Sequence, residues 1–298
     1  MDSSKKKRIK YAIAKWLFFI PDKPMVCFQY WLKLKRWPNM TNPQRFTEKL
    51  QYYKVHYRNE DMKRCVDKYD VRAFVEERLG TTKYLNTLFQ MCKTADQIDF
   101  DALPNQFVIK TTDGGDGANV LVCTDKSKLN IPETIKTVNS WRNKRYDYVS
   151  REWAYKGAAN SRVIVEKYLE DDANADGSID DYKFLCYDGK FRFLWVDKDR
   201  FSHHKRGFWD ENLNFLEGVY SDWPTFDKGG IPLPENIQEM IELSEKLAKG
   251  FPFARIDWYN IKGTITFGEI TFYPWSGKVI YTPDSFDFEL GKYFNVKQ

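Results

Sequence analysis

The alternation of apolar and polar positions predicts a chain that mixes α-helices with β-strands. Apolar residues recur every three or four positions in segments 41–53, 70–79, 133–144 and 234–249, as on the buried face of a helix. Short apolar or alternating runs lie between these segments and predict strands. The predicted strands are 106–110, 119–123, 162–169, 181–185, 191–196, 253–259 and 264–270.

The order of these elements indicates the fold class. Helices and strands follow one another without an internal repeat, which favours an α+β arrangement in two lobes. With 298 residues, 42% of them hydrophobic, the chain can bury one large core or two modest ones. We therefore expect an ordered α+β protein rather than a repeat array.

Two carboxylates stand out on a predicted hairpin near the C-terminus. Asp257 lies in the run FARIDWY and Glu269 in the run TITFGEI, with a turn at 260–263 between them. Antiparallel pairing can place both side chains on one face, where their charges repel unless a cation holds them. Such oxygen ligands suit Mg²⁺, which completes its shell with water and phosphate oxygens. A surface hairpin with two solvated acids is the alternative, and the pair alone does not decide.

A glycine-rich segment follows the strand 106–110. That strand ends at Lys110, and the sequence TTDGGDG at 111–117 leads into the strand 119–123. Glycines at a hairpin tip leave backbone N–H groups able to surround phosphates, with the lysine nearby. The segment is neither a Walker A loop nor a dinucleotide fingerprint, because no Gly-Lys-Ser/Thr follows and no helix opens after it. A plain turn is the alternative.

Two further segments, together with the features above, resemble a known family. The strand 162–169 becomes polar at its end, and the strand 181–185 carries Lys183. With Lys110, the glycine-rich loop, Arg255-x-Asp257 and Glu269-x-Thr271, they resemble the nucleotide site of the ATP-grasp superfamily. The chain is similar to the TupA-like ATP-grasp family, which is associated with teichuronopeptide and bacterial surface-polysaccharide biosynthesis. The similar segments are 42–51, 66–75, 181–190 and 267–277, within a resemblance that spans about residues 41–292.

The resemblance implies an ATP-grasp fold, in which two α+β lobes with antiparallel sheets grip the nucleotide. Residues 1–40 would form a basic helical extension and 41–298 the catalytic region, with a nucleotide-gripping lobe at about 105–170 and a metal-binding lobe at about 171–298. It also implies an ATP- and Mg²⁺-dependent carboxylate–amine ligase that acts through an acylphosphate and amidates a uronic acid or similar acidic glycan. A metal-dependent glycosyltransferase and a non-catalytic nucleotide-binding module stay open as alternatives.

The resemblance also assigns roles to individual residues. The nucleotide would contact Lys110, Gly114, Gly115, Asp116, Gly117, Glu166, Lys167, Leu169 and Lys183. Mg²⁺ would bind Asp257, Glu269 and Thr271, while Arg255, Lys183 and Arg200 would act in catalysis. Thr271 departs from the superfamily, which usually has asparagine there. A hydroxyl is a shorter and weaker ligand than an amide oxygen, so the number of metal ions stays open.

A basic cluster follows the predicted strands of the second lobe. Residues 199–206 read DRFSHHKR, and Arg200, His204, Lys205 and Arg206 are candidates to bind an acidic substrate. Arginine suits this task because it grips carboxylate and phosphoryl oxygens with two parallel hydrogen bonds. A solvated loop is the alternative.

The net charge of +5 is concentrated at the N-terminus. The first 36 residues hold ten lysines and arginines against two aspartates, a net charge of +8, which leaves −3 for the remainder. A nucleic-acid-binding protein should carry positive charge on its folded domain, so we do not expect that function. The five cysteines are odd in number and lack a C-x-x-C pair, which favours reduced thiols in the cytoplasm over disulfides.

The same N-terminal segment mixes lysines with Trp16, Phe18 and Phe19. It is too short and too charged for a membrane span and lacks a signal-peptide cleavage site. Residues 1–20 could lie on an anionic membrane surface, or they could form an amphipathic helix packed on the body. We therefore expect a cytoplasmic protein and leave open its peripheral attachment to the inner face of the plasma membrane.

Overall fold

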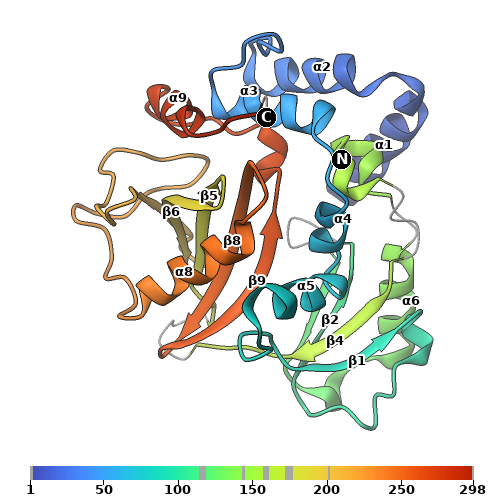
Figure 1. Cartoon of the computed structure of the whole chain (residues 1–298). Coiled ribbons are helices and arrows are strands. Elements are labelled where there is room, and N and C mark those ends of the chain that lie inside the picture. The colour runs from blue at the N-terminus through green and yellow to red at the C-terminus, as the bar shows by residue number, and fades with distance from the viewer. Residues whose placement is uncertain are drawn as a thin grey trace.

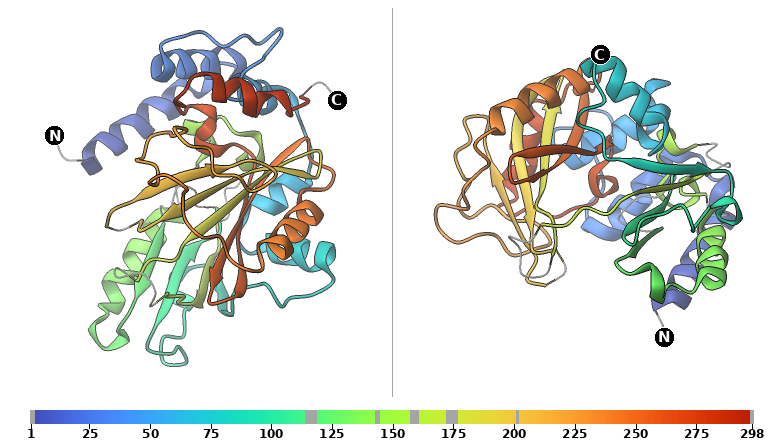
Figure 2. Two further views of the ribbon diagram at one scale, coloured as in Figure 1. Left: turned by 90° about the vertical axis from the view of Figure 1, so that its left-hand side faces the viewer. Right: turned by 90° about the horizontal axis from the view of Figure 1, so that it is seen from below.

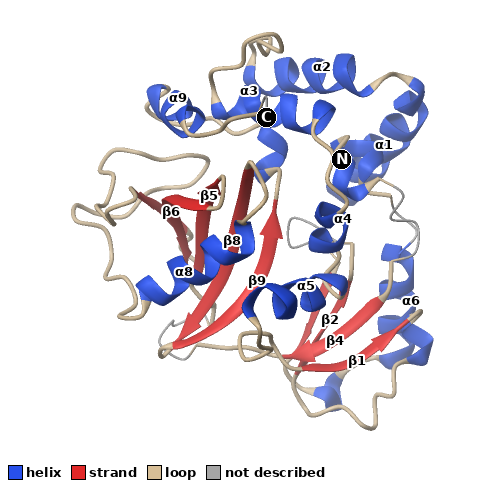
Figure 3. Ribbon diagram, viewed as in Figure 1, coloured by secondary structure: helices blue, strands red, loops and turns tan. Residues whose placement is uncertain are grey.

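The structure is a computed structural model that describes residues 3–113, 119–142, 145–156, 161–171, 177–200 and 202–296. Helices and strands mix in an α+β fold, as the sequence predicts, and the strands form two antiparallel sheets (Figure 1). Figure 3 shows the two sheets side by side, with a layer of helices across one end of both.

The helical layer comes mostly from the N-terminal part of the chain. It contains α1 (Ser3–Trp16), α2 (Asp22–Leu34), α3 (Phe46–His56) and, from the other end of the chain, α9 (Ser285–Lys292). Two shorter helices, α4 (Asp61–Val66) and α5 (Asp70–Leu79), lead down between the sheets. Helix α5 has the bounds that its apolar spacing predicts, and Gly80 ends it in the left-handed conformation with φ of 71°.

The smaller sheet has the strand order β1-β4-β2-β3. Its strands are β1 (Leu88–Cys92), β2 (Phe107–Thr111), β3 (Val120–Cys123) and β4 (Val163–Lys167). One face packs against α6 (Ile131–Arg142), where Phe107, Ile109 and Val138 are fully buried in one core. Because side chains alternate along a strand, Lys110 and Glu166 lie on the opposite face.

The larger sheet has the strand order β7-β6-β5-β8-β9. Its strands are β5 (Asp181–Tyr187), β6 (Lys190–Lys198), β7 (Lys205–Trp209), β8 (Phe253–Ile261) and β9 (Thr264–Thr271). Helix α8 (Ile237–Ala248) covers one face, where the indole N–H of Trp258 donates to Ser244 Oγ at 2.8 Å. The views of Figure 2 show α8 on one side of this sheet. The face that α8 does not cover, called the open face below, carries Lys183, Arg255 and Asp257, all of them buried.

The register of the larger sheet aligns the charged residues of its open face. Lys183 on β5 lies opposite Asp257 on β8, which in turn lies opposite Glu269 on β9. A β-bulge follows at Gly268, where an added Cβ would come within 2.9 Å of the Asp257 carbonyl oxygen. Glycine therefore allows the close approach of β8 and β9 beside the two carboxylates.

The sequence predicted α5, α6, α8 and the strands β2 to β6, β8 and β9 close to their observed bounds. For α3 it predicted a start at 41–43, but the helix begins at Phe46, where the Arg45 N–H donates to the Glu48 side chain as in a capping box. It did not predict α4, α9, β1 or β7, which are short or lack a clean period. Helices α1 and α2 lie within residues 1–40, where a helical extension was expected. The shortest helical elements are α7 (Asp147–Ser150), η1 (Leu17–Phe19), η2 (Ala95–Gln97), η3 (Lys126–Lys128), η4 (Trp153–Tyr155) and η5 (Pro274–Gly277). Over the described ranges, none of the helices has the length and apolar character needed to cross a bilayer.

Candidate active site

Arg255 is the centre of a polar cluster on the open face of the larger sheet. Its Nε donates to Asp257 Oδ1 at 2.7 Å, and its Nη2 donates to Asp257 Oδ2 at 2.6 Å. The same Nη2 donates to Glu269 Oε1 at 2.8 Å and to Thr271 Oγ1 at 3.0 Å. Strand alternation and the β8–β9 register thus bring together the residues that the sequence proposed for metal binding.

The positions of the side-chain oxygens around Arg255 indicate whether Mg²⁺ could bind at this site. Asp257, Glu269 and Thr271 all direct an oxygen at a single positively charged nitrogen, so the site is already built to surround a cation. Throughout the described ranges, no three His, Cys, Asp or Glu side chains group together as a metal site. Two carboxylates and a hydroxyl suit Mg²⁺ nonetheless, because this ion takes few protein ligands and relies on phosphate oxygens and water.

Lys183 lies in the same cluster, between two carboxylates. Its Nζ bonds to Asp257 Oδ2 at 2.9 Å and to the carboxylate of Asp181. Burial raises the pKa of Asp257 to about 6, although Arg255 and Lys183 act in the opposite direction. The other Asp181 oxygen, Oδ1, is buried without a hydrogen-bond partner among the described residues. Sequence reasoning missed Asp181, although its position two residues before Lys183 on a strand put both on one face.

A second group of charges surrounds Asp197 on β6. Arg206 Nε donates to Asp197 Oδ1 at 2.6 Å, and His204 Nε2 lies 2.9 Å from the same oxygen. Burial by itself would raise the pKa of Asp197, but His204, Arg206 and Lys183 together hold it well below its usual range. Arg200 Nη1 donates to Asp181 Oδ2 at 2.9 Å, so it joins this group to the Lys183 cluster.

Lys205 does not belong with these residues. It neighbours Arg206 on β7 and therefore points to the other face of the sheet, where its Nζ lies 3.5 Å from Asp227 Oδ2. The sequence analysis grouped Lys205 with Arg200, His204 and Arg206 because it did not predict strand β7 and so did not assign its two faces.

The smaller sheet supplies Lys110 and Glu166, whose side chains form an ion pair of 2.9 Å. Arg72 on α5 pairs with the other oxygen of Glu166 at 3.2 Å. The backbone N–H of Lys167 donates to Thr87 O, and its carbonyl accepts from Asn86, both at 2.9 Å. The backbone groups of Lys167 thus already have protein partners, and Leu169 follows half-buried after the strand.

Lys68 connects the two sheets electrostatically, a role that sequence analysis missed. It lies close enough to Glu269 for the two charges to favour each other, while Lys110 opposes it. Burial is the main reason that its pKa is lowered from the usual value. Its backbone N–H donates to Thr112 O at 2.8 Å, next to β2. Only the tertiary fold brings a residue from before α5 to this point.

The predicted phosphate loop, with Gly114, Gly115, Asp116 and Gly117, lies outside the described residues.

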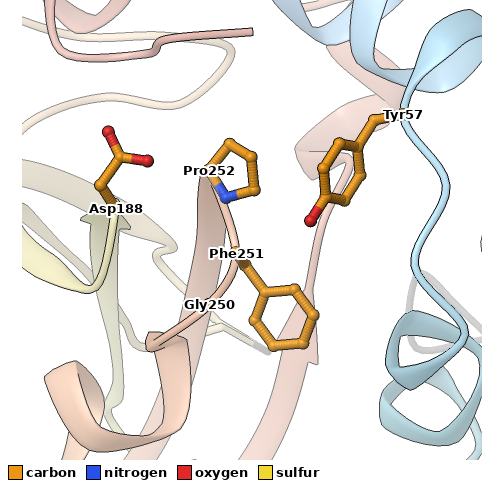
Figure 4. A pocket seen from close by; sticks show the side chains of 5 residues that line it. All are labelled: Tyr57, Asp188, Gly250, Phe251 and Pro252. Carbon is orange, nitrogen blue, oxygen red and sulfur yellow. The ribbon is translucent and has the colours of Figure 1, made fainter. Parts of the chain in front are cut away.

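A pocket of about 280 Å³ is lined by Tyr57, Asp188, Gly250, Phe251 and Pro252 (Figure 4). It lies at the β5–β6 turn and the start of β8, and none of the predicted site residues lines it.

Comparison with known proteins identifies the family. A sequence profile described as TupA-like ATPgrasp matches residues 48–295, which is most of the chain. The chain belongs to the TupA-like ATP-grasp family. No curated protein matches this TupA-like chain in sequence.

Solved structures of ligases resemble the TupA-like protein at low identity. L-amino acid ligase from Bacillus licheniformis is 13% identical over 88% of this chain and 57% of its own, with a TM-score of 0.47. D-alanine–D-alanine ligase from Bacillus anthracis, complexed with ATP, is 16% identical over 70% and 53%, with a TM-score of 0.41. ATP-grasp ligase PsnB, with Mg and ADP, is 10% identical over 82% and 62%, with a TM-score of 0.41. The TupA-like chain therefore spans little more than half of these proteins.

Proposed function

We propose that this TupA-like ATP-grasp protein is an ATP- and Mg²⁺-dependent carboxylate–amine ligase that acts through an acylphosphate. The observation that carries this proposal is the convergence of Asp257, Glu269 and Thr271 on Arg255, with Lys183 beside them. Phosphoryl transfer needs charge neutralisation and positioning more than it needs a general base. A buried cluster of alternating cations and carboxylates supplies both.

Each residue of the cluster has a role in this reaction. Lys110 and Lys183 would hold the phosphates, with Lys68 as a third cation, and Glu166, Lys167 and Leu169 would frame the adenine. The loop 114–117 would cover the phosphates. Mg²⁺, when bound by Asp257, Glu269 and Thr271, would neutralise phosphate oxygens. Arg255, released from its carboxylates, would stabilise the transferred phosphoryl group as the substrate carboxylate attacks it.

The Asp197 group supports an acidic substrate beside the phosphate site. The strand order places β6 and β7 on the side of the sheet away from β9 and the smaller sheet. We propose that Arg206, His204 and Arg200 bind the carboxylate acceptor, because arginine binds carboxylates with two hydrogen bonds. We propose an acidic glycan such as a polysaccharide uronic acid as the acid, with an amino acid or other amine as its partner.

Nucleotide preference is the experiment that tests this function. We expect ATP with Mg²⁺ to raise the melting temperature of the protein more than GTP or a UDP-sugar does. ADP release from ATP should then depend on a uronate oligosaccharide together with an amine. Stabilisation by a UDP-sugar alone would favour a glycosyltransferase, and ATP binding without any substrate-dependent ADP release would favour a non-catalytic module.

The N-terminal helices support the proposal that the protein binds an anionic membrane surface on the cytoplasmic side. The segment formed by α1 and η1 packs on the body, since Tyr11 and Phe18 contact the ring of Tyr148, and Arg151 donates to Leu17 O at 2.7 Å. Its other side stays open: Ile9, Ile13, Trp16 and Phe19 are between 42% and 76% exposed. Lys10 and Lys15 are exposed beside this apolar row, which is the composition of a helix that lies on acidic lipid.

A further inference from the structure

A turn of unusual backbone conformation lies shortly after β9, which ends at Thr271. Within η5 (Pro274–Gly277), Trp275 has φ of 46° and Ser276 has φ of 57°, and Gly277 continues with φ of 64°. The left-handed region is unfavourable for a tryptophan, so two successive non-glycine residues there need support from their surroundings. The turn lies between α3 and the end of the larger sheet (Figure 1).

Two polar side chains of α3 provide that support. Lys54 Nζ lies 2.6 Å from Ser276 O and 2.5 Å from Ser276 Oγ. Gln51 Nε2 donates to Ser276 O at 3.1 Å and to Gly277 O at 2.9 Å. The Lys54 side chain is fully buried, and its nearest carboxylate is Glu152 at 3.9 Å, so the backbone of the turn is its main partner. A buried lysine used in this way is costly and implies that the turn conformation matters.

The turn places Trp275 on the open face of the sheet. The Trp275 ring stacks on Trp195 with centroids 4.5 Å apart and an angle of 19° between the planes. Arg206 lies over Trp275 at 4.4 Å, and Arg255 lies over Trp195 at 4.9 Å. Stacking and cation–π contacts therefore connect the turn to the two arginines of the site.

We infer that Lys54 and Gln51 are positioning residues, which act through the Trp275 turn to hold Arg255 where it meets the γ-phosphate. This inference rests on the proposed nucleotide site. Neither residue touches the substrate. Their hydrogen bonds fix Trp275, Trp275 fixes Trp195, and Trp195 supports the guanidinium of Arg255.

The test measures how much the γ-phosphate contributes to binding. Calorimetric titration gives the dissociation constants of Mg·AMP-PNP and Mg·ADP. Their ratio measures how much the γ-phosphate strengthens binding. Lys54→Met and Trp275→Leu should each lower the preference for the triphosphate about fivefold, and the double variant should lower it no further. Lys49→Met is the matched control, because Lys49 lies on the same helix and donates to Gly291 O and Phe294 O.

The outcomes separate this inference from the proposed function. If Lys54→Met keeps the wild-type ratio, or if its effect adds to that of Trp275→Leu, the positioning role is wrong. Should Lys54→Met fail to fold, Gln51→Met removes the other donor and is expected to give the same loss. Equal affinity of the wild type for both nucleotides would overturn the proposed role of Arg255 itself. A near-ultraviolet circular dichroism signal from the stacked indoles should weaken in Lys54→Met and persist in Lys49→Met.

Discussion

At the residue scale, we expect neutral substitutions of the two carboxylates beside Arg255 to reduce activity most. Asp257→Asn and Glu269→Gln each remove a negative charge that balances Arg255 and an oxygen available to Mg²⁺. We expect Mg²⁺-dependent ADP release from ATP to fall about a hundredfold or more in each variant, the usual effect of losing one preorganised electrostatic group. A coupled assay with uronate oligosaccharide and an amine measures the rate.

Glu245→Gln is the control for these variants. Glu245 lies on α8, on the covered side of the same sheet, and bonds to Lys190 at 3.2 Å and to the Phe191 N–H at 3.1 Å. It should keep wild-type turnover. Undiminished turnover in Asp257→Asn, with a wild-type circular dichroism spectrum, would remove the carboxylate pair from the proposed mechanism.

Lys54 gives the protein a dependence of stability on pH. Burial lowers its pKa to about 7, with Lys278 acting in the same direction and Glu152 against it. The unfolded chain then binds more protons than the folded protein between pH 7 and the usual lysine pKa, so stability rises with pH in this window. From pH 7 to 9 we expect Lys54 to contribute about 1 to 2 kcal/mol to the free energy of unfolding.

Urea unfolding at the two pH values measures this contribution. The difference between wild type and Lys54→Met isolates Lys54 from other groups that titrate in the same range. A wild-type stability that rises no more steeply than that of Lys54→Met would show that Lys54 keeps its ordinary pKa in the folded protein.

At the element scale, the β8–β9 hairpin depends on the bulge at Gly268. An added Cβ would lie 2.9 Å from the Asp257 carbonyl oxygen and 3.4 Å from Asp257 Cβ, so β9 would have to move away from β8. Gly268→Ala should cost about 1 to 3 kcal/mol of stability, as overpacking does, and should also weaken Mg²⁺-dependent ATP turnover.

Thr264→Ala is the matching substitution, because Thr264 lies exposed at the start of the same strand. It should leave both the melting temperature and turnover near wild-type values. A Gly268→Ala protein with unchanged melting temperature would mean that the hairpin can absorb the extra methyl group, and the bulge would then not be required for the site.

At the scale of the whole molecule, the exposed row on α1 and η1 predicts peripheral membrane binding. Each lysine near an anionic surface contributes roughly 1 kcal/mol, and salt screens the attraction. Co-sedimentation with vesicles should rise with phosphatidylserine content, fall with added salt, and be lost in a Trp16→Ser/Phe19→Ser variant. Trp223→Ser replaces a tryptophan that is 44% exposed on the other lobe and should bind as wild type does. Protein that stays in the supernatant at low salt would rule out the membrane role.

The sequence by itself determined the elements with a clear period and the order of the motifs. Apolar spacing predicted α5, and alternation predicted β8 and β9, because local burial on one face repeats every 3.6 or 2 residues. Antiparallel pairing of these two strands could place Asp257 and Glu269 on one face, and the family resemblance added Thr271. The order of lysines and carboxylates along the chain pointed to the family.

The tertiary structure alone decided which face each charge occupies and which distant residues meet. Arg255 forms hydrogen bonds with the predicted metal ligands, and Lys205 points away from Arg206 once β7, which the sequence did not predict, pairs with β6. Lys68 reaches Glu269, and Lys54 reaches Ser276, across about 200 residues of sequence. Contacts of this range arise only when separate helices and sheets pack together, and that packing is a property of the whole fold.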